Sequence, residues 1–173
     1  MNFNVHRYVY EHRALVSELM LRMARELSIR GRRHDNSKLT EPEYTGWSTS
    51  YPIIKDHLDH PDAVLSAKEE EKLNQVKNDF QVTLGHHYEA NDHHPQHFGQ
   101  DGIMKMSLMQ IQEMLADWYA CAIREGIDPI TFLHNKCLEH DIPEDLSQVL
   151  LNTLTWLMER GGVPNGKNEI EKE

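Results

Sequence analysis

The stretch Arg33-His34-Asp35-Asn36-Ser37-Lys38 places two potential metal ligands next to each other, with a basic residue on either side. Imidazole and carboxylate groups are common ligands of divalent metals in proteins. If the segment is helical, Lys38 shares a face with His34 and Asp35, because residues three and four apart are neighbours on a helix. A chain with twelve histidines can contain a His-Asp pair by chance, so its meaning depends on the rest of the sequence.

The composition indicates a globular protein with a core of its own, since 39% of the 173 residues are hydrophobic. We expect one domain over residues 1–162 and a polar, flexible tail over 163–173. No apolar run is long enough for a bilayer, and the N-terminus lacks the hydrophobic region of a signal peptide. Two cysteines, Cys121 and Cys137, do not suggest a disulfide framework. We therefore expect a cytoplasmic protein that does not bind membranes.

The charge is negative overall and unevenly distributed. A net charge of −10 argues against general nucleic-acid binding through a basic surface. Residues 1–38, however, hold eight of the 18 Lys and Arg residues and only four of the 28 Asp and Glu residues. A positive segment beside His34-Asp35 suits a small anion such as a phosphate. Equally, Arg30, Arg32 and Arg33 could serve only to complement the C-terminal dipole of a helix.

Apolar residues recur at helical spacing along most of the chain, which predicts an all-α fold of six to seven helices. No strand or hairpin pattern stands out. Capping-box patterns begin at Thr40, Ser66 and Ser107, and Gly31 is expected to end the first helix. The expected helices cover residues 4–30, 32–39, 66–90, 107–125, 128–139 and 143–160, with short helical turns and a loop over 44–62.

Three potential ligands lie on or beside the apolar faces of these helices. His12 is in the middle of the stripe on the first helix, although a histidine there is more often a hydrogen-bonded core residue than a ligand. His87 extends the stripe of the helix over 66–90. Asp117 stands next to Trp118 at the edge of a third stripe. A carboxylate in that position needs a partner or a metal if it is buried, and is an ordinary surface residue if it is exposed.

Five histidines lie within residues 86–97, namely His86, His87, His93, His94 and His97. This density favours metal or substrate contact over a polar helix end that is merely rich in histidine. A continuous helix would place residues 86 and 93, and likewise 87 and 94, on common faces, but Asn91-Asp92 favours a break. The sequence therefore leaves open whether a second metal binds.

The order His, His-Asp, further histidines and Asp resembles the HD superfamily of metal-dependent phosphohydrolases over about residues 5–125. The resemblance implies an all-helical, HD-domain-like bundle that binds a divalent metal, which could be Mn, Fe, Co, Ni, Zn or Mg, as one or two ions. The ligands that it implies are His12, His34, Asp35 and Asp117, with His87 and His93 added if two ions bind.

The segment from His34 to Lys38 also resembles the His-Asp-x-Gly-Lys variant, in which the lysine neutralises substrate phosphate; here Ser37 replaces the glycine. Within the superfamily, the chain is similar to a small uncharacterised group of phage and bacterial proteins. The shared features are the His-Asp-x-Ser-Lys segment, the histidine pairs of residues 86–94 and the Asp117-Trp118 pair. This similarity implies no established substrate.

The leading hypothesis is a phosphohydrolase that acts on a small phosphate ester, most plausibly a nucleotide, by attack of a metal-bound water. Lys38 is expected to stabilise phosphate charge, and Glu89 or another nearby carboxylate to serve as general base. The expected substrate contacts are Arg33, Lys38, His86 and His94.

Two other hypotheses remain open. Some HD-type proteins are di-iron oxygenases, and the histidine content is compatible with that chemistry. The chain could also be a non-enzymatic protein that binds a nucleotide or signalling molecule, as a phage anti-defence protein would. The aromatic residues Trp47, Tyr51 and Phe98 could line a pocket or the surface of a homo-oligomer.

Overall fold

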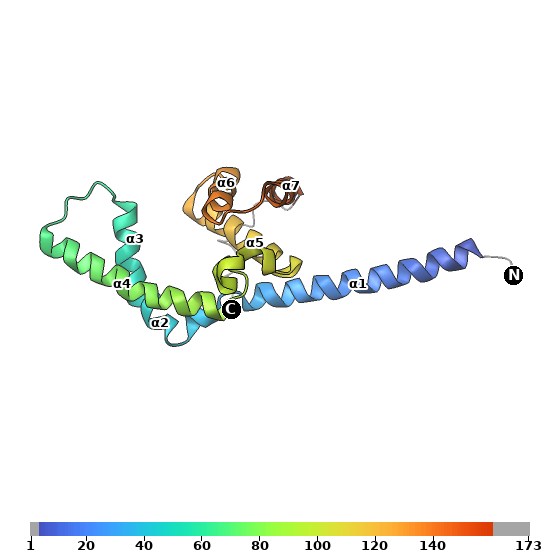
Figure 1. Ribbon diagram of the computed structural model, residues 1–173, viewed down its shortest axis with the longest axis horizontal. Helices are drawn as coiled ribbons and strands as arrows, with labels where there is room; N and C mark the ends of the chain where they lie inside the picture. Colours follow the sequence, from blue (N-terminus) through green and yellow to red (C-terminus); the bar gives the residue numbers. More distant parts are fainter. Residues whose placement is uncertain (1–3, 161–173) are drawn as a thin grey trace, which may run out of the picture. The chain divides into compact units, whose positions relative to one another are not determined.

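The computed structural model describes residues 4–160 and shows an all-α protein (Figure 1). Within that range the α-helices are α1 (Val5–Arg33), α2 (Glu43–Thr45), α3 (Tyr51–Asp59), α4 (Ala67–Ala90), α5 (Leu108–Glu125), α6 (Pro129–Glu139) and α7 (Glu144–Arg160). Two 3₁₀ segments, η1 (Asn36–Leu39) and η3 (Pro95–Lys105), and one π-helical segment, η2 (Gly46–Ser50), connect them. The predicted all-α class is confirmed.

The chain divides into two compact units, Met1–Gln110 and the part that begins at Ile111. Each unit is described by itself, and a single domain over residues 1–162 stays a prediction. The predicted tail over 163–173 lies outside the described residues. None of the helices between residues 4 and 160 combines the length and the apolar character that crossing a membrane requires.

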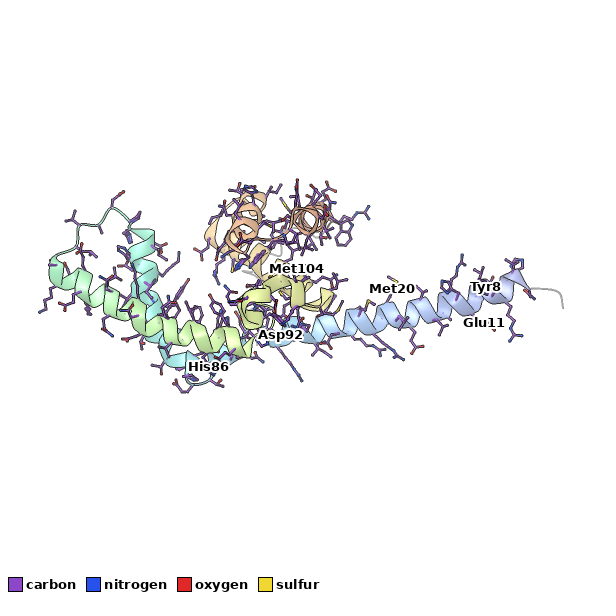
Figure 2. All side chains as sticks on the ribbon, in the orientation of Figure 1. Tyr8, Glu11, Met20, His86, Asp92 and Met104 are labelled. Carbon is purple, nitrogen blue, oxygen red and sulfur yellow. The ribbon has the colours of Figure 1, made fainter. Side chains whose placement is uncertain are left out.

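α1 begins the first unit and runs further than predicted. Asn4 caps it by accepting a hydrogen bond from the Arg7 backbone N–H at 3.0 Å. Gly31 does not end the helix, because a glycine in an exposed helix costs only about 1 kcal/mol relative to alanine. The apolar face that the sequence places in a core is exposed, as at Leu15. Met20, which is labelled in Figure 2, is another exposed residue of this face. The periodicity thus predicted the helix correctly, whereas the expected burial is not observed.

α4 is the central helix of the first unit, and α3 and η2 pack against it (Figure 1). Ser66 and Glu69 form the predicted capping box at its start. The buried face consists of Leu73, Phe80, Thr83 and His87. The prediction that His87 extends the buried face is therefore confirmed.

η2 approaches α4 more closely than a side chain would allow. Gly46 is buried against Thr83, and a Cβ atom on Gly46 would lie 1.9 Å from the Thr83 Oγ1. The next residue, Trp47, packs edge-on against Phe80 with ring centroids 5.0 Å apart. The missing side chain at position 46 lets η2 hold the Trp47 indole beside the C-terminal half of α4.

The second unit contains most of α5 together with α6 and α7. α5 buries Met114, Leu115, Trp118 and Ala122, close to the stripe that the sequence predicts. The Trp118 ring stacks on His140, which follows α6, with centroids 5.5 Å apart. α7 packs on α6 and buries Leu150 and Leu154.

We expect Gly46→Ala to lower the free energy of unfolding by about 1–3 kcal/mol, because the added methyl group overlaps the Thr83 side chain. Gly85→Ala is the matched control, since a Cβ at Gly85 on α4 meets no atom within 4 Å. The control should be neutral or stabilise by up to about 1 kcal/mol. Urea unfolding of the two variants measures both effects, and equal midpoints would contradict the close approach.

Candidate metal centre

The His34-Asp35 pair lies where α1 ends and the chain turns. His34 leaves the helix with φ −49° and ψ 128°, and Asp35 adopts a left-handed conformation with φ 56° and ψ 18°. Asp and Asn tolerate this region better than other residues that carry a side chain. The predicted helix over 32–39 is therefore wrong, since only Asn36–Leu39 forms a 3₁₀ turn after the reversal. The turn brings the Asp35 carboxylate to the end of α4.

Helix α4 ends at Ala90, as the Asn91-Asp92 sequence predicts. Asn91 caps the helix, and its Nδ2 donates to the His87 carbonyl at 2.8 Å and to the Ser37 Oγ at 2.7 Å. His93 and His94 then return toward His87, with the His87 and His94 ring centroids 4.8 Å apart. Figure 2 marks this region by His86 on α4 and by Asp92 just beyond its end.

Asp92 joins this loop to the end of α1. Its carboxylate forms an ion pair with Arg30 and accepts a hydrogen bond from the Gln110 Nε2 at 2.6 Å. Burial alone would raise the pKa of Asp92, but Arg30 and Gln110 together hold it below its usual value. Asp92, the residue directly before His93, is thus held by both Arg30 and Gln110.

Four side chains in the first unit could hold one metal ion: Asp35, His87, His93 and His94. Their potential ligand atoms all lie within 4.8 Å of one another. The Asp35 Oδ1 lies 3.4 Å from the His87 Nε2 and 3.5 Å from the His93 Nε2, and the His87 Nε2 lies 3.0 Å from the His94 Nε2. His87 and His93 are each only 2% exposed.

This geometry fits a divalent ion. Ligands about 2.1 Å from a metal at octahedral or tetrahedral angles are roughly 3.0–3.4 Å apart, close to the distances observed here. The Asp35 Oδ1 is buried and makes no hydrogen bond to any residue between 4 and 160. Burying an acceptor without a partner costs about 1–3 kcal/mol or more, so a cation among these atoms would satisfy it.

The electrostatics of the cluster suit metal binding. Burial alone would raise the pKa of Asp35, but the hydrogen bond and charge of Lys38, together with His34 and His87, lower it below the usual value. Burial lowers the pKa of His87, and this effect outweighs the opposing influence of Asp35. Near neutral pH, Asp35 is therefore a carboxylate and His87 a neutral imidazole, the forms in which both bind metals.

Lys38 contacts Asp35 through Oδ2, the carboxylate oxygen other than the one nearest His87 and His93. Its Nζ lies 2.6 Å from the Asp35 Oδ2 and 4.1 Å from the centre of the Trp47 ring. The predicted proximity of Lys38 to Asp35 is confirmed, although the turn is 3₁₀ and not α-helical. Its ion pair and its cation–π contact together fix the position of the ammonium group.

Glu43 is a member of the site that the sequence did not predict. This carboxylate is fully buried at the start of α2 and contacts the Nδ1 atoms of His86 at 2.9 Å and His87 at 2.8 Å. Burial alone would raise its pKa, but hydrogen bonds with His86, Ser37 and His87 lower it below the usual value. The predicted capping box from Thr40 to Glu43 is wrong, since no side chain caps α2 and Glu43 faces the interior.

Not every predicted ligand joins the cluster. His34 lies beside it, with its Nε2 3.5 Å from the Asp35 Oδ2 and its ring centroid 4.4 Å from that of His93. His12 does not, because it lies on the same continuous helix about six turns earlier, roughly 30 Å away. Assigning His12 to the same site within one chain is therefore incorrect. Asp117 belongs to the second unit, where the Cys121 Sγ lies 3.7 Å from its Oδ1, and its role stays a prediction.

The predicted substrate and catalytic residues are also distributed differently from expectation. His94 is one of the four potential ligands. His86 binds Glu43 and keeps 41% of its side chain exposed. Arg33 is exposed at the end of α1. Glu89 is exposed on α4 about 200° around the helix from His87, so it faces away from the cluster and does not fit the predicted general base.

We expect His87→Ala and His93→Ala to weaken binding of Mn²⁺, Co²⁺, Ni²⁺ or Zn²⁺ by more than the roughly 10–100-fold loss typical of a change outside the ligand set. His97→Ala is the matched control in the same histidine-rich segment, since His97 is exposed and its Nδ1 contacts the Tyr88 carbonyl. Titration calorimetry and metal analysis measure the effect. A loss caused by His12→Ala but not by His93→Ala would contradict this site.

A protein-family model matches most of the chain. The model described as "Family of unknown function (DUF5662)" matches residues 1–157. The matched range includes Asp35, the histidines of the cluster, Lys38 and Glu43. Comparisons with curated proteins and with solved structures found no match. The chain is a member of the DUF5662 family.

Proposed function

We propose that the protein is a metal-dependent phosphohydrolase that acts on a small phosphate ester, most plausibly a nucleotide. One observation supports this proposal above all: a set of one carboxylate and three imidazoles, of which His87 and His93 are buried, lies next to a lysine that is held in place. The carboxylate and the imidazoles suit a divalent metal, and the lysine suits an anionic substrate. Metal-dependent hydrolysis of a phosphate ester uses both.

The net charge of the ligand set is compatible with catalysis by a bound divalent ion. Asp35 contributes one negative charge, and neutral imidazoles from His87, His93 and His94 contribute none. Asp35, His87, His93 and His94 would hold a divalent ion with a net positive charge, and such an ion would supply polarisation of a phosphoryl oxygen and a lower pKa of a coordinated water molecule. The burial of His87 and His93 keeps bulk water away from one side of the site.

Lys38 is the residue that we assign to substrate charge. Its ammonium group lies beside Asp35 and against the Trp47 ring, so little side-chain entropy remains to be lost when a phosphate binds. Arg33 and His86 have exposed side chains and remain proposed contacts for the rest of the substrate. Asp117 remains a proposed further ligand on the basis of the sequence resemblance.

We expect purified protein loaded with Mn²⁺, Co²⁺, Ni²⁺, Mg²⁺, Zn²⁺ or Fe²⁺ to release phosphate from at least one member of a panel of nucleotides and other phosphate esters. Asp35→Asn should lower kcat/KM by about 100-fold or more, because the neutral amide removes the only carboxylate of the four-residue set. Asparagine retains both the size of the side chain and its tolerance of the left-handed backbone.

The control for this variant is Asp79→Asn, which removes an exposed carboxylate from α4. Unchanged activity in Asp35→Asn would overturn the proposal. Tight nucleotide binding without turnover would identify a binding protein, and oxygen consumption by the iron-loaded protein would identify an oxygenase.

We expect Lys38→Gln to lower kcat/KM for phosphate esters by roughly 10–100-fold, the effect of losing a hydrogen bond to a charged group. The main change should be in KM if Lys38 binds the ground-state phosphate, and in kcat if it stabilises charge that develops during the reaction. Lys55→Gln is the control, since Lys55 pairs with Asp59 on the surface of α3. Equal kinetics in the two variants would show that Lys38 does not act on the substrate.

A further inference from the structure

We propose that Glu43 is a positioning residue, which fixes the proton of His87 on Nδ1 and thereby directs the Nε2 lone pair into the metal centre. The inference rests on the proposed metal site and goes beyond it, because it assigns a role to a residue outside the ligand set. Carboxylates that hold the distal nitrogen of a ligating histidine commonly orient the ring and increase its basicity.

The hydrogen bonds around His87 determine which nitrogen carries the proton. A neutral imidazole has one N–H, and an ionised carboxylate can only accept, so the 2.8 Å contact with the Glu43 Oε2 requires the proton on Nδ1. The Asn91 Nδ2 also lies 3.0 Å from this nitrogen. Its two hydrogens, however, have acceptors of their own in the Ser37 Oγ and the His87 carbonyl.

The other nitrogen of the same ring is the one that faces the ligand set. The His87 Nε2 lies 3.4 Å from the Asp35 Oδ1 and 3.0 Å from the His94 Nε2. If the proton were on Nε2, it would point at these atoms and the nitrogen would have no lone pair for a metal. The Glu43 carboxylate therefore selects the only neutral tautomer in which His87 can be a ligand through Nε2.

Glu43 is held in place independently of any metal. It accepts hydrogen bonds from His86 and Ser37 in addition to His87. The Ser37 hydroxyl that binds Glu43 also accepts from Asn91, and so connects the turn after α1 with the end of α4. This gives the serine of the His-Asp-Asn-Ser-Lys segment a role that a glycine could not fill.

The test compares metal binding by wild type, Glu43→Gln and the control Glu41→Gln. Glu41 is an exposed carboxylate two residues away that accepts a hydrogen bond from the Thr45 Oγ1 at 2.8 Å. We expect Zn²⁺ and Mn²⁺ affinities, measured by titration calorimetry, to fall by about 10–100-fold in Glu43→Gln and to stay unchanged in Glu41→Gln. In the metal-free wild type, long-range ¹H–¹⁵N correlation spectra should show the proton of His87 on Nδ1.

Equal affinities in wild type and Glu43→Gln, or a His87 proton on Nε2 in the wild type, would overturn the role of Glu43. If Glu43→Gln fails to fold, the tautomer in the wild type decides alone. Neither measurement uses enzymatic activity, so the two proposals can fail separately. A protein that hydrolyses no phosphate ester but loses metal affinity in Glu43→Gln would retain this role of Glu43 without the hydrolase.

Discussion

The Asp35 carboxylate is the group on which the arrangement of the candidate site depends. One of its oxygens faces His87 and His93, while the other binds Lys38. A carboxylate with so little exposure needs compensation for lost hydration, and the Lys38 ammonium provides part of it. The left-handed backbone at Asp35 directs the chain back toward α4, so one residue determines both the local path of the chain and the charge of the site.

Much of the fold could be predicted from local signals. The Ser66 capping box, the apolar face of α4 and the break at Asn91 all depend on residues a few positions apart, and the structure confirms each of them. Where a prediction depended on distant parts of the chain, it was less successful. The apolar stripe on α1 correctly predicts a helix, but the expected burial of the stripe is not observed. Gly31 was expected to end α1, but an exposed glycine destabilises a helix only slightly and α1 continues past it.

In the site, too, features that depend on neighbouring residues could be predicted, whereas contacts between distant residues could not. His34-Asp35 and the histidine cluster were recognised because they are concentrated in short segments. The sequence correctly predicts that Lys38 lies next to Asp35, but it predicts this from an α-helix. The turn is instead a 3₁₀ helix, which also aligns residues three apart. Glu43 could not be recognised, since its two histidine partners lie more than forty residues later. Its spacing from Thr40 suggested a surface cap, and only the packing of α2 against α4 shows that it is buried.

The conformation of Asp35 restricts how this protein can evolve. Most side chains are strained at a φ of 56°, and asparagine and glycine are the replacements that avoid much of this strain. Asparagine also retains the shape of the side chain and differs only in charge. A lineage that lost the proposed metal site but retained the turn after α1 would therefore accumulate asparagine or glycine here. The identity of this one residue would distinguish family members that retain the proposed metal site from relatives that preserve only the fold.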